Sequence, residues 1–306
     1  MRPSIFFSKV ATRAAWPVTR RDRGTAPLVP PVLCYHRVLP RSGNDKQQAR
    51  YSVTPAQFRA QMSVLASEGF TSLTLREFSE AMRGLRELPP RSALITFDDG
   101  YNDNYALAWP IAREFGMKLN LFICTGLVEG ENIEVFERRT ISEKRSEEDY
   151  PALWQPLQWS QLREMSAAGV DVQFHSHGHE NMGSLSSADI TADAARGISL
   201  FKKHLGFTPT YFAFPFGHYG SYPHVARALL AEQGIEIFFT TELGRKTVED
   251  KQTTFSRIVI HTEDDLDSFR RKIYGGYDWM GTLRQLHYRV RGLLSSDQST
   301  RWSEGS

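Results

Sequence analysis

The chain has 306 residues, of which 41% are hydrophobic and 12% aromatic, so it can bury a full core and is neither disordered nor fibrous. Its formal net charge of +2, with 24% charged residues, provides no overall field that would attract nucleic acid or an acidic polymer. No uncharged apolar run reaches the length of about 18 residues that a membrane span needs.

The chain begins with a basic segment. Residues 1–23 contain six basic residues and one acid, and their one apolar cluster is three residues long. A secretory signal has an apolar stretch of about 7 to 15 residues. We therefore predict a basic, mobile extension over residues 1–30 and, by default, a cytoplasmic protein. The proline-rich residues 26–32 lead from this extension into the first strand.

The globular part, residues 31–273, is predicted to be a single catalytic domain in which strands alternate with helices. The predicted strands cover residues 32–36, 92–97, 118–124, 171–175, 210–215, 235–241 and 255–261. Thr54 and Pro55 have the features of a helix start, and Ser160 is predicted to cap a later helix. This alternation predicts an α/β fold with a barrel-like sheet of about seven parallel strands covered by helices.

Other segments do not follow this alternation. Residues 129–149 combine dense mixed charge with no apolar period, which predicts a surface insertion. Residues 274–306 form a tail in which 279–294 could fold into a short amphipathic helix that docks on the barrel or contacts a membrane surface, with docking preferred. The two cysteines, Cys34 and Cys124, lie within apolar runs and are predicted to be free, buried thiols.

The run ALITFDDG ends in two adjacent carboxylates, Asp98 and Asp99. Consecutive residues on a strand point to opposite faces, so the two can share a site only where the strand ends and Gly100 lets the chain turn. Functional sites of parallel α/β folds are built at that end of the strands. Taken alone, the pair is equally compatible with Asp99 capping the next helix and Asp98 facing water.

A second apolar run, VQFHSHGHEN, ends in three histidines. His175 and His179 are four residues apart, which predicts that their imidazoles meet on one helical turn while His177 points elsewhere. Together with a carboxylate from another strand end, this pair has the composition of a two-histidine, one-carboxylate metal site. Such a site leaves coordination positions open for water and substrate.

The motifs TFDDG and HSHGH resemble those of the polysaccharide deacetylases with a NodB homology domain, carbohydrate esterase family 4. The resemblance extends from Pro31 to Phe269 and implies a distorted (β/α) barrel with fewer strands than the regular form. It also implies a catalytic base at Asp98. The implied metal ligands are Asp99, His175 and His179, which would hold a divalent ion, with zinc as the first choice and cobalt or nickel as alternatives.

The third motif departs from the commoner family pattern, because FAFPFG has Ala213 where many members carry an arginine. In this respect the chain resembles the poly-N-acetylglucosamine deacetylases, in which the arginine comes later in the chain and an early YH motif supplies the acid. Arg257 and His36 fit these two roles, although Arg257 could be a surface residue and His36 a structural histidine. His261 is the alternative acid, since classical members carry theirs late; the VLCYHRV match favours His36.

The expected function is metal-dependent removal of N-acetyl groups from a glycan that contains N-acetylglucosamine. Asp98 would take a proton from the attacking water, and His36, expected to titrate near neutrality, would protonate the departing amine. A backbone N–H near Phe216 is a candidate for stabilising the oxyanion. Two alternatives remain open: a hydrolase of small cyclic amides on the same fold, and a degenerate sugar-binding module. The sequence does not specify the linkage, the native metal or the oligomeric state.

Overall fold

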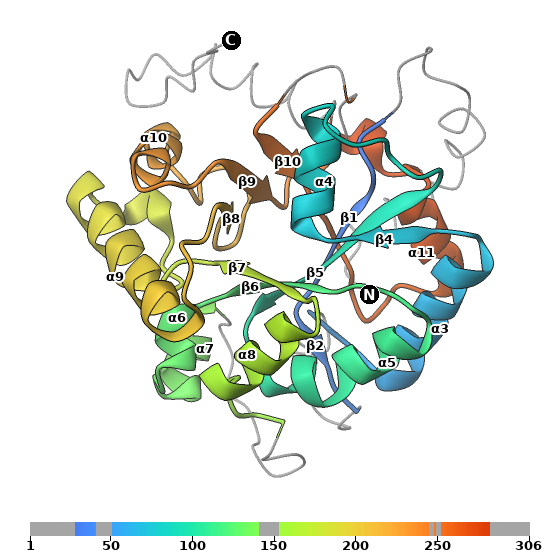
Figure 1. Ribbon diagram of the computed structural model, residues 1–306, viewed down its shortest axis with the longest axis horizontal. Helices are drawn as coiled ribbons and strands as arrows, with labels where there is room; N and C mark the ends of the chain where they lie inside the picture. The colour runs from blue at the N-terminus through green and yellow to red at the C-terminus, as the bar shows by residue number, and fades with distance from the viewer. Residues whose placement is uncertain (1–27, 41–50, 141–152, 245–247, 249–251, 282–306) are drawn as a thin grey trace.

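The computed structural model describes residues 28–40, 51–140, 153–244, 248 and 252–281, and in this part the chain folds as an α/β barrel (Figure 1). The predicted extension at 1–30, except its last three residues, and most of the tail lie outside the described residues, and the predicted location stays a prediction. No helix within the described ranges is long and apolar enough to cross a bilayer.

One parallel sheet forms the barrel, with the strand order β10-β9-β8-β7-β6-β5-β1-β11 and with β4 beside β5. Its strands are β1 (Val32–Tyr35), β4 (Thr71–Leu73), β5 (Ser92–Asp99), β6 (Asn120–Ile123), β7 (Asp171–Phe174), β8 (Tyr211–Ala213), β9 (Ile237–Thr240), β10 (Thr254–Ser256) and β11 (Ile258–Val259). A separate parallel pair consists of β2 (Arg37–Val38) and β3 (Ser52–Val53). The prediction of an α/β barrel with about seven parallel strands is confirmed; β4 and the β2–β3 pair were not predicted.

The barrel is closed by the segment that was predicted as one last strand. This segment is split at Arg257: β10 pairs with β9 on one side, and β11 pairs with β1 on the other. Arg257 itself continues the first ladder by donating its N–H to the carbonyl of Thr240 at 2.8 Å. Because the chain changes partners at this residue, the Arg257 side chain is held where the two edges of the sheet meet.

Helices surround the sheet (Figure 1). They are α3 (Pro55–Ser67), α4 (Leu75–Met82), α5 (Trp109–Glu114), α6 (Thr125–Val128), α7 (Ile133–Thr140), α8 (Trp159–Ala167), α9 (Ser187–Leu205), α10 (His224–Glu232) and α11 (Leu266–Ile273), with a π-helical turn η1 (Asn104–Ala108) and a 3₁₀ turn η2 (Met182–Ser184). The predicted start of α3 is confirmed: Thr54 forms a capping box with Gln57, and Pro55 occupies the first turn. At α8 the prediction was wrong: Gln158 and not Ser160 is the cap.

Helix α4 closes one end of the barrel. Its Phe78 packs in the same cluster as Leu94, Phe122 and Phe239 of the strands. The N–H of Leu75, the first residue of α4, donates to the Asn120 side chain at the amino end of β6. The amino ends of the strands are therefore covered, which leaves the carboxyl ends to build a site.

The segment predicted as a surface insertion contains α7, which contributes to packing near those carboxyl ends. Phe136 of α7 is fully buried in a small cluster with Tyr101, Cys124 and Leu127. One aromatic side chain among many charges was too weak a periodic signal to predict this helix.

The packing of α9 on the strand that leads to His175 generates a first prediction. A Cβ at Gly197 would fall inside van der Waals distance of the Phe174 ring, so Gly197→Ala overpacks the interface. We expect a loss of about 1–3 kcal/mol in the free energy of unfolding, measured by denaturant titration.

The matched control is Ala195→Gly at an exposed position of the same helix. It should cost about 0.5–1 kcal/mol through helix propensity alone. If Gly197→Ala is instead more stable than the wild type, propensity outweighs the contact with Phe174, and the tight α9–β7 packing is wrong.

Candidate active site

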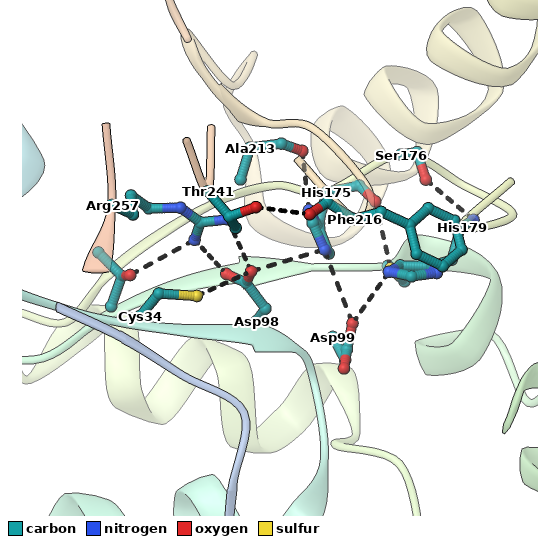
Figure 2. Close-up of polar contacts among 12 residues, drawn as sticks. Cys34, Asp98, Asp99, His175, Ser176, His179, Ala213, Phe216, Thr241 and Arg257 are labelled. Atoms are coloured by element: carbon teal, nitrogen blue, oxygen red, sulfur yellow. Dashed lines mark hydrogen bonds and ion pairs between the residues drawn. The ribbon is translucent and has the colours of Figure 1, made fainter. Parts of the chain in front are cut away.

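The two adjacent aspartates end β5, and the backbone turns at the second of them. Asp99 has φ 76° and Gly100 has φ 99°, both in the left-handed region. On a regular strand the two carboxylates would point to opposite faces. The turn thus begins one residue earlier than the sequence suggested, and it brings the Asp99 carboxylate to the same end of the barrel as that of Asp98 (Figure 2).

His175 and His179 come together, but not on a helical turn as predicted. His175 directly follows β7, and the chain then forms an irregular loop in which Ser176 (φ 70°) and His179 (φ 52°) are left-handed. The two imidazole rings lie 5.0 Å apart between centroids. The His179 N–H donates to Ser176 Oγ at 2.9 Å, which holds the loop closed.

A carboxylate from α9 anchors this loop. Asp193 accepts the backbone N–H groups of His177 and Gly178 at 2.9 and 2.8 Å. The ring of His177 turns away to Thr125, with Nδ1 2.9 Å from the threonine Oγ1. His177 is therefore not part of the histidine pair. Asp193 follows this histidine motif by 14 residues or more in the sequence, and nothing in the motif itself indicated that Asp193 would bind it.

Four buried ligand atoms converge near the ends of β5, β6 and β7. They belong to Asp99, Cys124, His175 and His179, and all lie within 4.8 Å of one another. His179 Nε2 is 3.4 Å and His175 Nε2 is 3.7 Å from Asp99 Oδ1. The group has the oxygen, nitrogen and sulfur donors that zinc accepts, so the residues present fit a divalent metal.

The backbone carbonyl of Ala213 orients one of these histidines. It lies 2.7 Å from His175 Nδ1, so Nδ1 carries the proton and Nε2 faces the carboxylates (Figure 2). A metal-binding histidine usually donates its second ring N–H in this way.

Asp98 is held in a buried, two-pronged ion pair with Arg257. The distances are 2.6 Å from Nη1 to Oδ1 and 2.8 Å from Nη2 to Oδ2, and Cys34 Sγ lies 3.4 Å from Oδ2 (Figure 2). Arg257 is fully buried, so the alternative that it is a surface residue is wrong. Burial is the largest single effect and would raise the pKa of Asp98, but the charge and hydrogen bonds of Arg257, together with His175 and His36, outweigh it and hold that pKa well below its usual range.

His36 lies beside this ion pair. One of its ring nitrogens is within 4.8 Å of Cys34 Sγ and of an Asp98 oxygen. Its Nδ1 is enclosed and has no hydrogen-bond partner among the described residues. Burial lowers the pKa of His36 to about 4, against a smaller opposing effect of Asp98. The expectation that His36 titrates near neutrality was wrong, because the desolvation of this ring depends on tertiary packing.

His261 and His36 both contact the ring of Tyr51, with centroid distances of 5.6 Å and 5.2 Å. His261 donates its backbone N–H to Asp264 at 2.7 Å. Of the two candidate acids, His36 is the one that the structure groups with Asp98.

Two aromatic rings pack against His179, one of them Phe216, which the sequence already placed near the site. Phe136 of α7 lies 5.3 Å and Phe216 lies 5.0 Å from the His179 ring centroid. Phe216 is left-handed, with φ 60°, and its carbonyl accepts the Thr241 hydroxyl at 2.7 Å. The PFG sequence was a signal for a tight turn here; nothing in the sequence placed Phe136 near a histidine.

Comparison with known proteins gives a consistent result. Residues 86–238 match the family model described as polysaccharide deacetylase. YxkH of Bacillus subtilis, provisionally named a polysaccharide deacetylase, is 25% identical over 245 residues, covering 80% of this chain and 74% of YxkH. Poly-beta-1,6-N-acetyl-D-glucosamine N-deacetylase of Staphylococcus aureus is 33% identical over 133 residues, 40% of this chain and 45% of that enzyme. The match thus spans less than half of the staphylococcal enzyme.

Two solved structures have the same fold. The deacetylase PplD of Streptococcus pyogenes, in complex with acetate, aligns with a TM-score of 0.66 at 22% identity, covering 81% of this chain and 99% of PplD. IcaB from Ammonifex degensii aligns with a TM-score of 0.62 at 24% identity, covering 83% and 97%. At these identities the likeness concerns the fold alone.

The buried ion pair generates a prediction about stability. Arg257→Met leaves Asp98 buried without its cation, so we expect a loss of about 3–5 kcal/mol in the free energy of unfolding near pH 7. The folded-state pKa of Asp98 lies below its ordinary value of 3.8, so the contribution of the pair is present above that pH and lost as the pH falls below it. Urea titrations between pH 3 and 7 measure the difference in the free energy of unfolding between variant and wild type. This difference should become smaller as the pH falls.

The control is Arg59→Met, which breaks an exposed ion pair with Glu114 and should leave stability nearly unchanged. If the difference in the free energy of unfolding between Arg257→Met and the wild type stays constant across this pH range, the assignment of Asp98 as an ionised partner is contradicted.

Proposed function

Because the chain belongs to the polysaccharide deacetylase family, we propose that it is a metal-dependent hydrolase that removes N-acetyl groups from a glycan containing N-acetylglucosamine. One observation carries this proposal: two adjacent aspartates have different partners. His175 Nε2 lies 3.7 Å from both carboxylates. Arg257, however, binds Asp98, whereas His179 lies 3.4 Å from Asp99. This division supplies one carboxylate for proton transfer and one for metal binding.

Asp99, His175 and His179 are the residues that would hold the metal, and zinc suits their donor atoms best. When bound, a divalent ion supplies a Lewis acid and lowers the pKa of a bound water. Cobalt and nickel are the alternatives, because imidazole binds both.

Asp98 acts as the proton acceptor in this proposal. Arg257 keeps it a carboxylate and fixes the plane of its two oxygens, since both guanidinium prongs are used. A water that attacks the acetyl carbonyl gives its proton to Asp98 as the carbon–oxygen bond forms.

His36 acts as the proton donor to the leaving group. With a pKa of about 4 it is neutral at rest near pH 7, so it can act as an acid only after it accepts a proton during the cycle. Asp98 is the nearby source, because a ring nitrogen of His36 and an Asp98 oxygen lie within 4.8 Å. The carbon–nitrogen bond then breaks, the sugar nitrogen takes the proton from His36, and acetate leaves.

The names of the relatives support a glycan as the substrate. The Staphylococcus aureus relative acts, by its name, on poly-β-1,6-N-acetyl-D-glucosamine, and a polymer of this kind is the substrate class we propose. A hydrolase of cyclic amides could use the same groups, and a degenerate sugar-binding module would need none of them. The pairing of Asp98 with Arg257 favours catalysis, since a binding module gains nothing from a buried ionised carboxylate.

The direct test is acetate release. The purified protein should release acetate from oligosaccharides of β-1,6-linked N-acetylglucosamine or from chitooligosaccharides. A chelator should abolish the release and added zinc should restore it. Release of acetate from none of these glycans, together with hydrolysis of a cyclic amide, would contradict the proposal.

The two aspartates can be separated by matched substitutions. Asp98→Asn should retain the metal and lose about 10²- to 10⁴-fold in kcat, because the proton acceptor is removed. Asp99→Asn should lose metal affinity as well. Metal content by elemental analysis and acetate release together decide the matter, and equal metal loss in both variants would mean that the roles are assigned wrongly.

The proton donor is tested by changing the leaving group. His36→Ala should depress the rate on an N-acetyl sugar far more than on an activated aryl acetate, whose leaving group departs without a proton. His261→Ala is the matched control and should affect both substrates little. The opposite pattern, with a selective loss in His261→Ala, would identify the late histidine as the acid.

A further inference from the structure

Cys124 lies between the two strand ends that carry the candidate metal ligands. It directly follows β6, and its N–H donates to the carbonyl of Asp99 on β5 at 2.9 Å. On the other side, the N–H of His175 donates to the carbonyl of Ile123 at 2.9 Å. Cys124 is therefore the neighbour, in the plane of the sheet, of both Asp99 and His175.

The side chain of Cys124 faces the same group of ligands. Side chains alternate along a strand, and Phe122, two residues earlier, packs in the cluster inside the barrel. The Cys124 thiol is fully buried, and in this protonated form it donates its S–H to the carbonyl oxygen of His175 at 3.2 Å. Its sulfur lies within 4.8 Å of ligand atoms of Asp99, His175 and His179.

The four ligand atoms form one compact group, in which all lie within 4.8 Å of one another. Zinc binds sulfur at about 2.3 Å and nitrogen at about 2.0–2.1 Å, so in a tetrahedral shell two ligand atoms lie about 3.3–3.6 Å apart. Binding of one ion would therefore draw the four atoms toward a common centre.

We propose that Cys124 Sγ is a fourth protein ligand of the metal, beside Asp99, His175 and His179, with water entering as a fifth ligand, a coordination number that zinc can adopt. This rests on the proposed metal-dependent function. A thiolate selects zinc or cobalt over manganese or magnesium, because soft sulfur binds the former far better. Cys124 would thus set the metal preference of this chain, which the other three ligands leave open.

The second cysteine provides an internal comparison. Cys34 is also fully buried, but its sulfur lies in a different group, with His36 and with Asp98, which binds Arg257. Burial is the largest cause that raises the pKa of the Cys34 thiol, so Cys34 keeps its proton. Cys124 and Cys34 are the chain's two cysteines, and they should therefore behave differently toward a metal.

The test uses the cobalt(II)-loaded protein. A cobalt–thiolate bond gives a charge-transfer absorption in the near ultraviolet that nitrogen and oxygen ligands do not give. We expect this band in the wild type at one cobalt per chain, its persistence in Cys34→Ala and its loss in Cys124→Ala and Cys124→Ser. Since Cys124→Ser is nearly isosteric, it keeps the test valid if the alanine variant folds poorly.

A competition titration measures the selectivity. Cys124→Ser should weaken zinc binding by more than about tenfold, since even outer-shell changes cost 10- to 100-fold, and should leave manganese binding nearly unchanged. If the wild type binds one cobalt per chain without the charge-transfer band, Cys124 is not a ligand. The assignment of Asp99, His175 and His179 as ligands would be unaffected. Absence of any cobalt or zinc binding would overturn this inference and the proposed metal dependence together.

Discussion

The buried ion pair between Arg257 and Asp98 is the interaction on which the rest of the site depends. Two buried charges are expensive to desolvate, and only a well-aligned pair offsets that cost. The barrel supplies the alignment, because the strand pairing changes at Arg257: the segment before it pairs with β9 and the segment after it pairs with β1. The pairing of Arg257 with Asp98 thus links the closure of the sheet to the ionisation of Asp98.

The neighbouring residues reach the site through unusual backbone conformations. Asp99, Ser176, His179 and Phe216 all have positive φ, and each such non-glycine residue costs about 1–3 kcal/mol. Among the described residues, Arg91 is the other non-glycine residue with positive φ. The strain is concentrated where the ligand atoms converge, and the packed barrel beneath compensates for it. A site on regular strands would direct Asp98 and Asp99 to opposite faces.

Much of the fold followed from the sequence because strand and helix periods are local properties. Six predicted strands exist as single strands and the seventh is split into β10 and β11, and the strand-end positions of Asp98 and His175 correctly indicated one end of a barrel. What could not be predicted depends on distant parts of the chain. The loop of His179 is irregular because Asp193 binds it, and the low pKa of His36 arises from burial. Cys124 seemed an ordinary apolar residue because its neighbours on β5 and β7 are not adjacent in sequence.

The central claim is that Arg257 divides the two aspartates into a proton acceptor and a metal ligand. Anomalous diffraction at the zinc edge, on crystals of the zinc-loaded protein, tests this claim most directly. The account predicts one zinc peak within bonding distance of Asp99, His175 and His179, with Asp98 still paired to Arg257 and not bound to the ion. A zinc ion bound to Asp98, with the guanidinium displaced, would contradict it.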